Sequence, residues 1–411
     1  MREKLKEFAK NSSVKNSAIL MVGTGISQII PVLFSPFLAR IYSPGSFGDL
    51  AIFVAISVIS AIIATGLYEY AIVLPKEDTD ALHIVCIIVV LAVVFSLISL
   101  VSILILRSFK EINTFYLYLP FSIFCTVTFN ILSSWYNRYK LYKQLNVLRI
   151  MQTVLIVGGS FFFYKNTNGL IYGYLLGGIF SLLIFFILFV NKLKDINVDL
   201  LKTNAIEYKK FPLVIMPSSV INTFSSYAPV FFIKNYFSSH TLGSYSMSAR
   251  VLTAPVSVIS TAIGQVYFKN ISDYHNEDKE QLLKKHFFST LKILSFLSLL
   301  IFLPLFFLGE DLMLLVFGSK WGEAGKYVEI IALSSMIKFI VSPLSMLLIV
   351  KKQLNKVARW QTMYFFTTIT IFFIGSFYSI TNLLWFYVIH ETILYVIYYF
   401  IIYSSFDKVK K

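Results

Sequence analysis

The chain is poor in the residues that build catalytic and metal sites. Its 411 residues include two cysteines, five histidines and 21 acidic residues, and only 14% are charged. Cys86 and Cys125 both lie in apolar segments, which predicts neither a disulfide framework nor a zinc site. There is no Walker, His-Glu-x-x-His or Gly-x-Ser-x-Gly motif, which argues against an ATPase, a metalloprotease or a serine hydrolase. We therefore expect no enzyme activity, no metal and no cofactor.

Apolar residues make up most of the chain instead, at 57%. A helix crosses the roughly 30 Å hydrocarbon layer with about 20 residues. Twelve predominantly apolar stretches are about this long, and they cover residues 17–41, 47–74, 82–106, 114–135, 147–164, 169–190, 211–233, 243–268, 287–308, 326–350, 357–378 and 382–403. The sequence therefore predicts an all-α integral membrane protein with twelve transmembrane helices, and the connections leave no room for a soluble catalytic domain.

The formal net charge of +15 reflects topology rather than nucleic-acid binding. Most basic residues, Arg138 and Arg149 among them, fall on the side of the predicted membrane that also holds both termini. By the positive-inside rule this side is the cytoplasm, so we expect a multi-pass membrane protein with both termini in the cytoplasm. The predicted parts are a cytoplasmic N-terminal segment, a first six-helix bundle, a cytoplasmic linker, a second six-helix bundle and a cytoplasmic tail, at 1–16, 17–190, 191–210, 211–403 and 404–411.

Two segments suggest that the bundles are related repeats. PFLARIYSPGSFGDL (36–50) and PVFFIKNYFSSHTLGSY (229–245) share a proline, a basic residue, an aromatic residue two positions later, a polar turn and a bulky residue followed by glycine. Each segment connects the first two helices of its half on the external side. Because each half has an even number of helices, both halves begin on the cytoplasmic side and the repeats are parallel. Such repeats are related by an axis along the membrane normal, and they enclose a central cavity suited to alternating access.

Arg250 is a full positive charge near the middle of predicted span 8, in SYSMSARVLTAPVSVIS. A charge at this depth costs about 2.5–3.5 kcal/mol on insertion scales, so it should not face lipid. Two interpretations remain open. The guanidinium pairs with a carboxylate such as Asp49 or Glu69, or it lines a hydrated cavity that receives an anionic substrate.

Further charged residues lie in or near the predicted spans. Lys338 is in the middle of span 10, whereas Arg40 and Lys234 are near external helix ends, where they line the cavity or extend to the interface. Together with Arg250 they are the candidate substrate-binding cations. The candidate residues for coupling to Na⁺ or H⁺ are Glu69, Asp49 and Glu391. Because cations outnumber carboxylates, the set favours an anionic substrate, whose phosphate oxygens suit the planar fork of an arginine.

Three stretches resemble lipid-linked oligosaccharide flippases, the Wzx-like polysaccharide biosynthesis proteins of the MATE-like superfamily: LARIYSPGSFGDLAIF (38–53), GSYSMSARVLTAPVSVISTAIGQVYF (243–268) and FGSKWGEAGKYVEIIAL (317–333). The resemblance implies two six-helix bundles around a cavity whose basic residues receive the pyrophosphate and sugars of a polyprenyl-linked unit. By position, Arg40 and Arg250 match cavity arginines of the related peptidoglycan-precursor flippases, and Asp49 matches an acidic residue there. Those relatives carry extra helices and more arginines in the first bundle.

The leading hypothesis is a flippase that moves a polyprenyl-diphosphate-linked glycan from the cytoplasmic to the external leaflet during surface polysaccharide assembly. Its partners are the lipid bilayer and a polysaccharide polymerase or glycosyltransferases. One alternative is a multidrug or metabolite exporter of the same architecture, which would rely on cavity carboxylates. Another is a membrane glycan polymerase or ligase, although such enzymes carry a larger external loop than this sequence offers.

Overall fold

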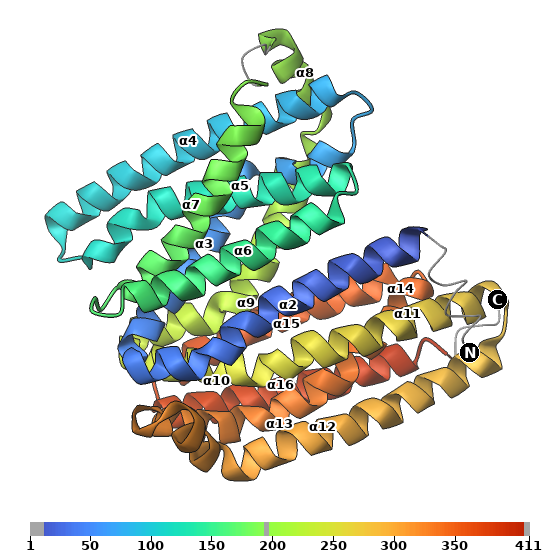
Figure 1. Ribbon diagram of the computed structural model, residues 1–411. Helices are drawn as coiled ribbons and strands as arrows, with labels where there is room; N and C mark the ends of the chain where they lie inside the picture. Colours follow the sequence, from blue (N-terminus) through green and yellow to red (C-terminus); the bar gives the residue numbers. More distant parts are fainter. Residues whose placement is uncertain (1–11, 193–196, 407–411) are drawn as a thin grey trace. The chain divides into compact units, whose positions relative to one another are not determined.

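Helices form all the regular secondary structure of the described residues. The computed structural model describes residues 12–192 and 197–406, and no strand occurs in these ranges. The α-helices, labelled in Figure 1, are α2 (Ser12–Ile41), α3 (Pro44–Thr65), α4 (Asp78–Phe109), α5 (Leu119–Arg138), α6 (Tyr142–Phe162), α7 (Gly169–Phe189), α8 (Val198–Glu207), α9 (Met216–Tyr236), α10 (Ser239–Pro255), α11 (Thr261–Asn276), α12 (Glu280–Phe317), α13 (Gly322–Leu344), α14 (Met346–Val350), α15 (Leu354–Gly375) and α16 (Ile380–Tyr403).

Shorter helical turns join several of these helices. Three are 3₁₀-helices, η1 (Tyr68–Val73), η2 (Thr114–Tyr118) and η5 (Ser319–Trp321). Two are π-helices, η3 (Phe211–Ile215) and η4 (Val256–Ser260). Both π turns stand beside a proline: Pro212 lies within η3, and Pro255 directly precedes η4. A proline removes a backbone donor, so the helix adjusts its hydrogen bonding at these positions.

Ten helical segments of the described residues are long and apolar enough to cross a membrane. The two other predicted spans, 211–233 and 357–378, correspond to α9 and α15, which have 21 and 22 residues but more polar side chains. The predicted spans thus coincide largely with helical segments, which is consistent with twelve spans, and the chain is an all-α, multi-pass membrane protein. One predicted boundary shifts, because α3 ends at Thr65 and the rest of span 47–74 is a turn followed by η1.

The described chain forms two compact units. Unit 1 consists of the residues up to Phe34 and of Asp49–Phe224, and unit 2 of Ser35–Gly48 and the residues from Ser225 onward. Unit 1 therefore includes the predicted linker 191–210, which contains α8, and also the start of the predicted second bundle. Residues 1–11 and 407–411, which make up much of the predicted terminal segments, lie outside the described residues.

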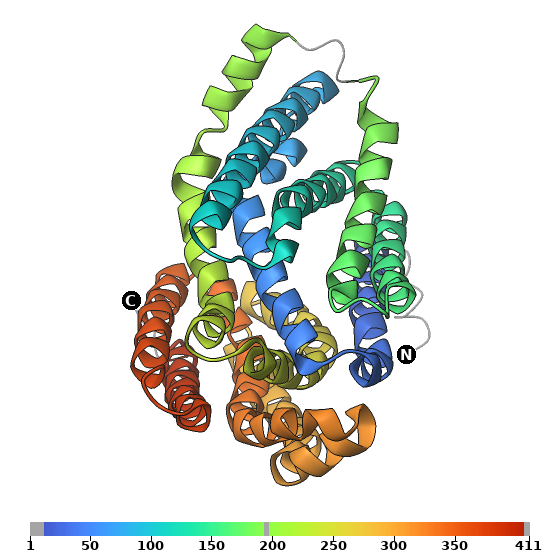
Figure 2. The same ribbon diagram turned by 90° about the vertical axis from the view of Figure 1, so that its left-hand side faces the viewer.

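In unit 1, α4, α6 and α7 pack against α5, and Figure 2 shows α3 beside these helices. Phe53 of α3 is fully buried, with its ring centroid 6.3 Å from that of Phe115 and 6.1 Å from that of Tyr174. One turn later the hydroxyls of Ser57 and Ser122 lie 2.8 Å apart. Small residues and buried hydroxyl pairs are typical of helix contacts in membranes, where polar groups find partners inside the protein.

Unit 2 is organised around α13, against which α10, α12 and α16 all pack. Phe339 of α13 is fully buried, with its ring centroid 5.7 Å from that of Phe302 in α12. The two segments with matching sequences also meet in this unit, because Gly48 and Gly243 lie where no Cβ atom fits. This packing places Lys338 on the central helix and Arg250 on one of its neighbours.

Candidate functional site

A polar cavity of about 670 Å³ lies within unit 1. We call it the unit 1 pocket. Residues of α3, η1, α5, α6, α7 and α9 line it, and its polar lining consists of Glu69, Tyr70, Thr126, Asn130, Ser133, Ser134, Arg149, Gln152, Tyr174, Ser219, Asn222 and Thr223. This volume lies in the range of about 300–1,000 Å³ that is common for small-molecule sites.

Glu69 is the carboxylic acid of the unit 1 pocket. After α3 ends, Gly66 and Leu67 adopt left-handed conformations with φ of 57° and 61°, and η1 then presents Glu69 to the cavity. The side chain is only 4% exposed. Its Oε1 accepts a long hydrogen bond of 3.4 Å from Asn130 Nδ2, whereas its buried Oε2 has no hydrogen-bond partner in the described ranges. Glu69 therefore lies beyond α3 rather than in the transmembrane helix.

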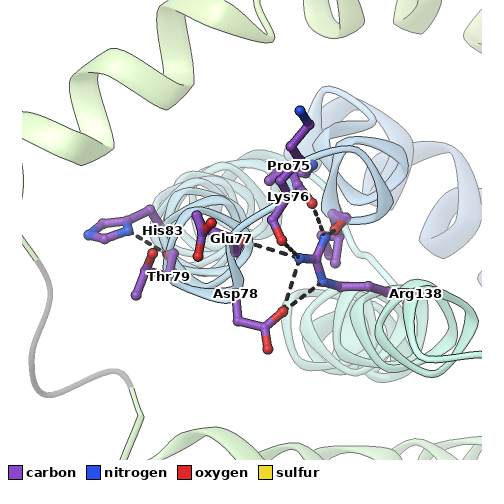
Figure 3. Close-up of polar contacts among 8 residues, drawn as sticks. Pro75, Lys76, Glu77, Asp78, Thr79, His83 and Arg138 are labelled. Atoms are coloured by element: carbon purple, nitrogen blue, oxygen red, sulfur yellow. Dashed lines mark hydrogen bonds and ion pairs between the residues drawn. The ribbon is translucent and has the colours of Figure 1, made fainter.

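The other end of η1 is held by Arg138, the last residue of α5 (Figure 3). Its guanidinium donates to the carbonyl oxygens of Ile72 and Pro75 at 3.0 and 2.7 Å. It also forms a salt bridge of 3.0 Å with Asp78, the first residue of α4. The Arg138 side chain is only 8% exposed, so its bonds to the carbonyl oxygens are little screened, whereas the Asp78 side chain is 60% exposed and its salt bridge is screened by water. We call this arrangement the Arg138 clamp.

Arg149 supplies the positive charge of the unit 1 pocket. It lies on α6, where Arg149, Gln152 and Ile156 occupy one helix face at spacings of three and four residues and line the cavity together. One guanidinium nitrogen donates to Thr24 Oγ1 of α2 at 2.6 Å. Arg149 was predicted only to be one of the cytoplasmic basic residues. Its spacing from Gln152 in an apolar helix was the signal that could have revealed this role.

Lys338 and Glu391 form an ion pair in unit 2. Lys338 Nζ of α13 lies 3.5 Å from Glu391 Oε1 of α16, and Tyr364 Oη donates to the same oxygen at 2.7 Å. The Glu391 side chain is 3% exposed, compared with 39% for Lys338. The predicted substrate-binding cation and the predicted coupling carboxylate are thus partners, and each neutralises much of the charge of the other.

Arg250 has a different environment. It is partly buried on α10, with its Cζ atom 5.7 Å from the ring centroid of Phe47. Phe47 is itself packed edge-on against Trp321, whose Nε1 donates to the carbonyl oxygen of Ala39 at 2.9 Å. Among the described residues of unit 2, no carboxylate forms an ion pair with Arg250. A guanidinium beside an aromatic ring keeps its hydrogen-bond donors available for another acceptor.

The other predicted site residues are placed as follows. Arg40 is exposed in the last turn of α2, and Lys234, in the last turn of α9, donates to the Ser239 hydroxyl. Both belong to unit 2, like Arg250. Asp49 is partly buried near the start of α3 and belongs to unit 1 with Glu69. No group of three or more potential metal-ligating side chains occurs in residues 12–192 and 197–406.

Comparisons of the sequence give a consistent group of relatives. A family model described as "Polysaccharide biosynthesis protein" matches residues 37–326. A Klebsiella pneumoniae protein described as "Uncharacterized membrane protein in cps region" is 25% identical over 170 residues, which cover 41% of this chain and 33% of that protein. The Staphylococcus aureus capsular polysaccharide biosynthesis protein CapF is 25% identical over 220 residues, which cover 50% of this chain and 54% of CapF. The chain therefore spans only about a third to a half of these curated relatives' lengths.

Comparisons of the structure indicate the same fold as known transporters. An inward-facing multidrug resistance MATE family transporter of the MOP superfamily aligns with a TM-score of 0.70 at 13% identity, over 95% of this chain and 100% of that one. A MOP superfamily transporter from Pyrococcus furiosus, whose structure is described as having a binding pocket of reverse polarity, aligns with a TM-score of 0.60 at 14% identity, over 97% and 96%. At these identities the likeness concerns the fold.

Proposed function

Because the chain belongs to the polysaccharide biosynthesis protein family, we propose that it moves a polyprenyl-diphosphate-linked oligosaccharide from the cytoplasmic to the external leaflet of the bacterial inner membrane. Family membership supports a role in polysaccharide synthesis. The transporter fold supports translocation rather than catalysis. The oligosaccharide would come from cytoplasmic glycosyltransferases and pass to an external polymerase.

The cargo has two parts with opposite solvent preferences. A polyprenyl tail is stable in the hydrocarbon layer, whereas a diphosphate and a hydroxyl-rich glycan cannot enter it without polar partners. A protein that carries this head across must offer hydrogen-bond donors and positive charge inside the membrane. No bond in the cargo needs to be broken.

The environment of Arg250 is the observation that supports the proposal most strongly. A charged side chain within a transmembrane helix is a candidate for the transport pathway unless a partner neutralises it. Lys338 has such a partner in Glu391, whereas Arg250 has no carboxylate partner in the described part of unit 2. Its planar fork suits two oxygens of a phosphate. We assign the diphosphate to Arg250, with Arg40 and Lys234 as supporting cations.

The proposal is tested in a strain whose surface polysaccharide depends on this protein. Arg250→Ala should reduce the surface polysaccharide by about tenfold or more and cause lipid-linked intermediate to accumulate, because a charge-assisted contact of the head is lost. Arg250→Lys should retain part of the activity. Arg107→Ala, at the exposed end of α4, is the matched control. Normal surface polysaccharide in the Arg250→Ala strain, at normal protein level, would exclude this anion site.

The multidrug transporter among the similar structures favours a second candidate, a drug or metabolite exporter. Such a protein would depend on its buried carboxylates rather than on Arg250. Deletion of the gene distinguishes the two. A flippase predicts loss of surface polysaccharide with unchanged drug susceptibility, whereas an exporter predicts the opposite result.

We further propose that transport is coupled to Na⁺ or H⁺ through a buried carboxylate, with Asp49, Glu69 and Glu391 as candidates. Glu391 already has Lys338 as a counter-ion, which disfavours it as a site for an external cation. Transport into vesicles with imposed Na⁺ or pH gradients tests the coupling. Rates that are the same with and without both gradients would exclude it.

A further inference from the structure

We propose that the unit 1 pocket binds an uncharged sugar residue of the glycan head, with Glu69, Asn130, Ser133 and Arg149 as its hydrogen-bonding groups. This inference rests on the proposed function, because it assumes that the cargo carries a glycan. It adds a sugar-binding site in unit 1 to the phosphate-binding residues assigned to unit 2.

The lining of the pocket has the mixture of groups that a sugar requires. Each sugar hydroxyl is both a donor and an acceptor, so a sugar site needs carboxylate and amide oxygens together with amide and guanidinium N–H groups. The pocket supplies all of these from the side chains of Glu69, Asn130, Gln152, Asn222 and Arg149. Tyr70 and Tyr174 add aromatic surface that can cover the apolar face of a sugar ring.

Two buried polar atoms at the pocket have no hydrogen-bond partner in the described residues: Glu69 Oε2 and Ser133 Oγ. Buried polar groups in native proteins are nearly always hydrogen-bonded, and each exception needs an explanation such as a bound molecule. The Glu69 side chain is more than nine-tenths buried, and the hydrogen bond that it accepts from Asn130 is long at 3.4 Å. Both atoms are closed off from the cavity as the side chains stand, so a small rotation of each side chain would let a sugar hydroxyl donate to the carboxylate and accept from the serine hydroxyl.

The charge of the pocket argues for a sugar rather than the diphosphate. Glu69 and Arg149 are its two charged residues, one of each sign. A diphosphate placed here would face a buried carboxylate and a single cation, which is unfavourable in a medium of low dielectric constant. An uncharged sugar meets no such repulsion. The phosphate and sugar parts of the cargo would thus be recognised by different residues.

The pocket wall is held in place from both ends of η1. At one end, the Gly66 Cα lies so close to Pro212 that an added Cβ would be 2.8 Å from the Pro212 Cβ. At the other end, the Arg138 clamp holds the connection between η1 and α4 (Figure 3). Glu69 and Tyr70 lie between these fixed points. A site that is held this firmly is suited to distinguish one sugar from another.

The binding claim is tested by thiol protection in purified full-length protein. In a background with Cys86→Ser and Cys125→Ala, a Ser134→Cys thiol at the pocket is labelled with a water-soluble maleimide. Three compounds are then added separately: the strain's complete lipid-linked unit, the oligosaccharide released from it by mild acid, and inorganic pyrophosphate. We expect the first two to slow labelling at least threefold and pyrophosphate to have no effect. A Ser108→Cys thiol, exposed at the end of α4, is the control and should not be protected.

Protection by the complete unit without protection by the released oligosaccharide, up to its solubility limit, would overturn the sugar assignment. So would protection by pyrophosphate alone. Failure of the proposed function looks different. In that case the complete unit would not protect the thiol either, and deletion of the gene would leave surface polysaccharide unchanged.

A pair of substitutions separates sugar binding from ion coupling at Glu69. Glu69→Gln keeps the shape of the side chain and its ability to form hydrogen bonds, but it cannot carry a proton or a charge. Glu69→Leu loses both the hydrogen bonds and the charge. For a sugar contact we expect surface polysaccharide to fall by about threefold in the Gln variant and by tenfold or more in the Leu variant. Ser133→Ala provides a second, milder loss of one contact. Equal and complete loss in the Gln and Leu variants would assign Glu69 to ion coupling and contradict the sugar contact.

Discussion

Gly48 and Gly243 pack against the starts of each other's helices in unit 2. A Cβ added to Gly48 would lie 2.0 Å from the carbonyl oxygen of Ser239, the first residue of α10. A Cβ added to Gly243 would lie 1.6 Å from the carbonyl oxygen of Pro44, the first residue of α3. Each glycine is four residues into its own helix, so the contact is reciprocal.

We expect Gly243→Ala to destabilise the protein, because the methyl group would overlap a backbone carbonyl that no side-chain rotation can move. Overpacking of this kind costs about 1–3 kcal/mol. The measurement is the thermal unfolding midpoint in detergent. Gly158→Ala is the matched control, because no atom lies within 4 Å of the position that its Cβ would occupy. An unfolding midpoint equal to that of the control would contradict the close packing.

Loss of the Arg138 clamp should loosen the connection between η1 and α4. Arg138→Ala removes the donors to the carbonyl oxygens of Ile72 and Pro75, and such hydrogen bonds from a charged group are worth about 1.5–3 kcal/mol each. The lost salt bridge with the exposed Asp78 carboxylate adds less. We expect trypsin to cleave after Lys76 at least several-fold faster. Arg138→Lys should show an intermediate rate, because an ammonium cannot reproduce the fork geometry. Unchanged cleavage in the Ala variant, relative to Arg107→Ala, would show that the clamp does not hold this segment.

The Lys338–Glu391 pair predicts non-additive effects on stability. Lys338→Met alone leaves the buried Glu391 carboxylate without its counter-ion. Breaking a fully buried pair on one side costs about 3–5 kcal/mol, and we expect a smaller loss here because the Lys338 side chain is 39% exposed. The double variant Lys338→Met, Glu391→Leu removes both charges and should be more stable than the Lys338→Met variant. Thermal unfolding of the two single variants and the double variant forms a complete cycle. Additive losses would mean that the two side chains do not interact.

Trp321 supports the segment that carries Phe47, the ring beside Arg250. The indole is fully buried and donates to the carbonyl oxygen of Ala39. Trp321→Phe keeps much of the aromatic packing but leaves that buried carbonyl without its donor, at a cost of about 1–3 kcal/mol. We expect a lower unfolding midpoint and reduced surface polysaccharide. Full activity together with unchanged stability would show that the segment carrying Phe47 does not support the site around Arg250.

The apolar runs predicted the fold because the membrane imposes helices of a fixed length on any chain that crosses it. The match between segments 36–50 and 229–245 predicted a repeat, which stays a prediction, although the paired glycines of the two segments do meet in unit 2. The end of span 2 was predicted less well. Gly66 and Leu67 form a left-handed turn inside an apolar run, and only Gly66 indicated a break there.

The candidate site was predicted only in part. Charged residues in apolar helices stand out in a sequence, which is how Arg250, Lys338 and Glu391 were found. The pairing of Lys338 with Glu391 was not predictable, because it depends on how α13 and α16 pack. The unit 1 pocket was missed for the same reason. Its lining comes from six helical elements, and Asn130 or Gln152 alone is an ordinary polar residue in a membrane helix.

The most direct test of the central claim is translocation in vesicles that contain only the purified protein. The lipid-linked oligosaccharide is placed in one leaflet, and a membrane-impermeant enzyme that modifies the sugar reports its arrival in the other. We predict that the native protein accelerates transfer over protein-free vesicles and that Arg250→Ala lowers the rate by about tenfold or more, with Arg107→Ala unchanged. Transfer by the native protein no faster than in protein-free vesicles, or equal rates for the native and Arg250→Ala proteins, would contradict the account.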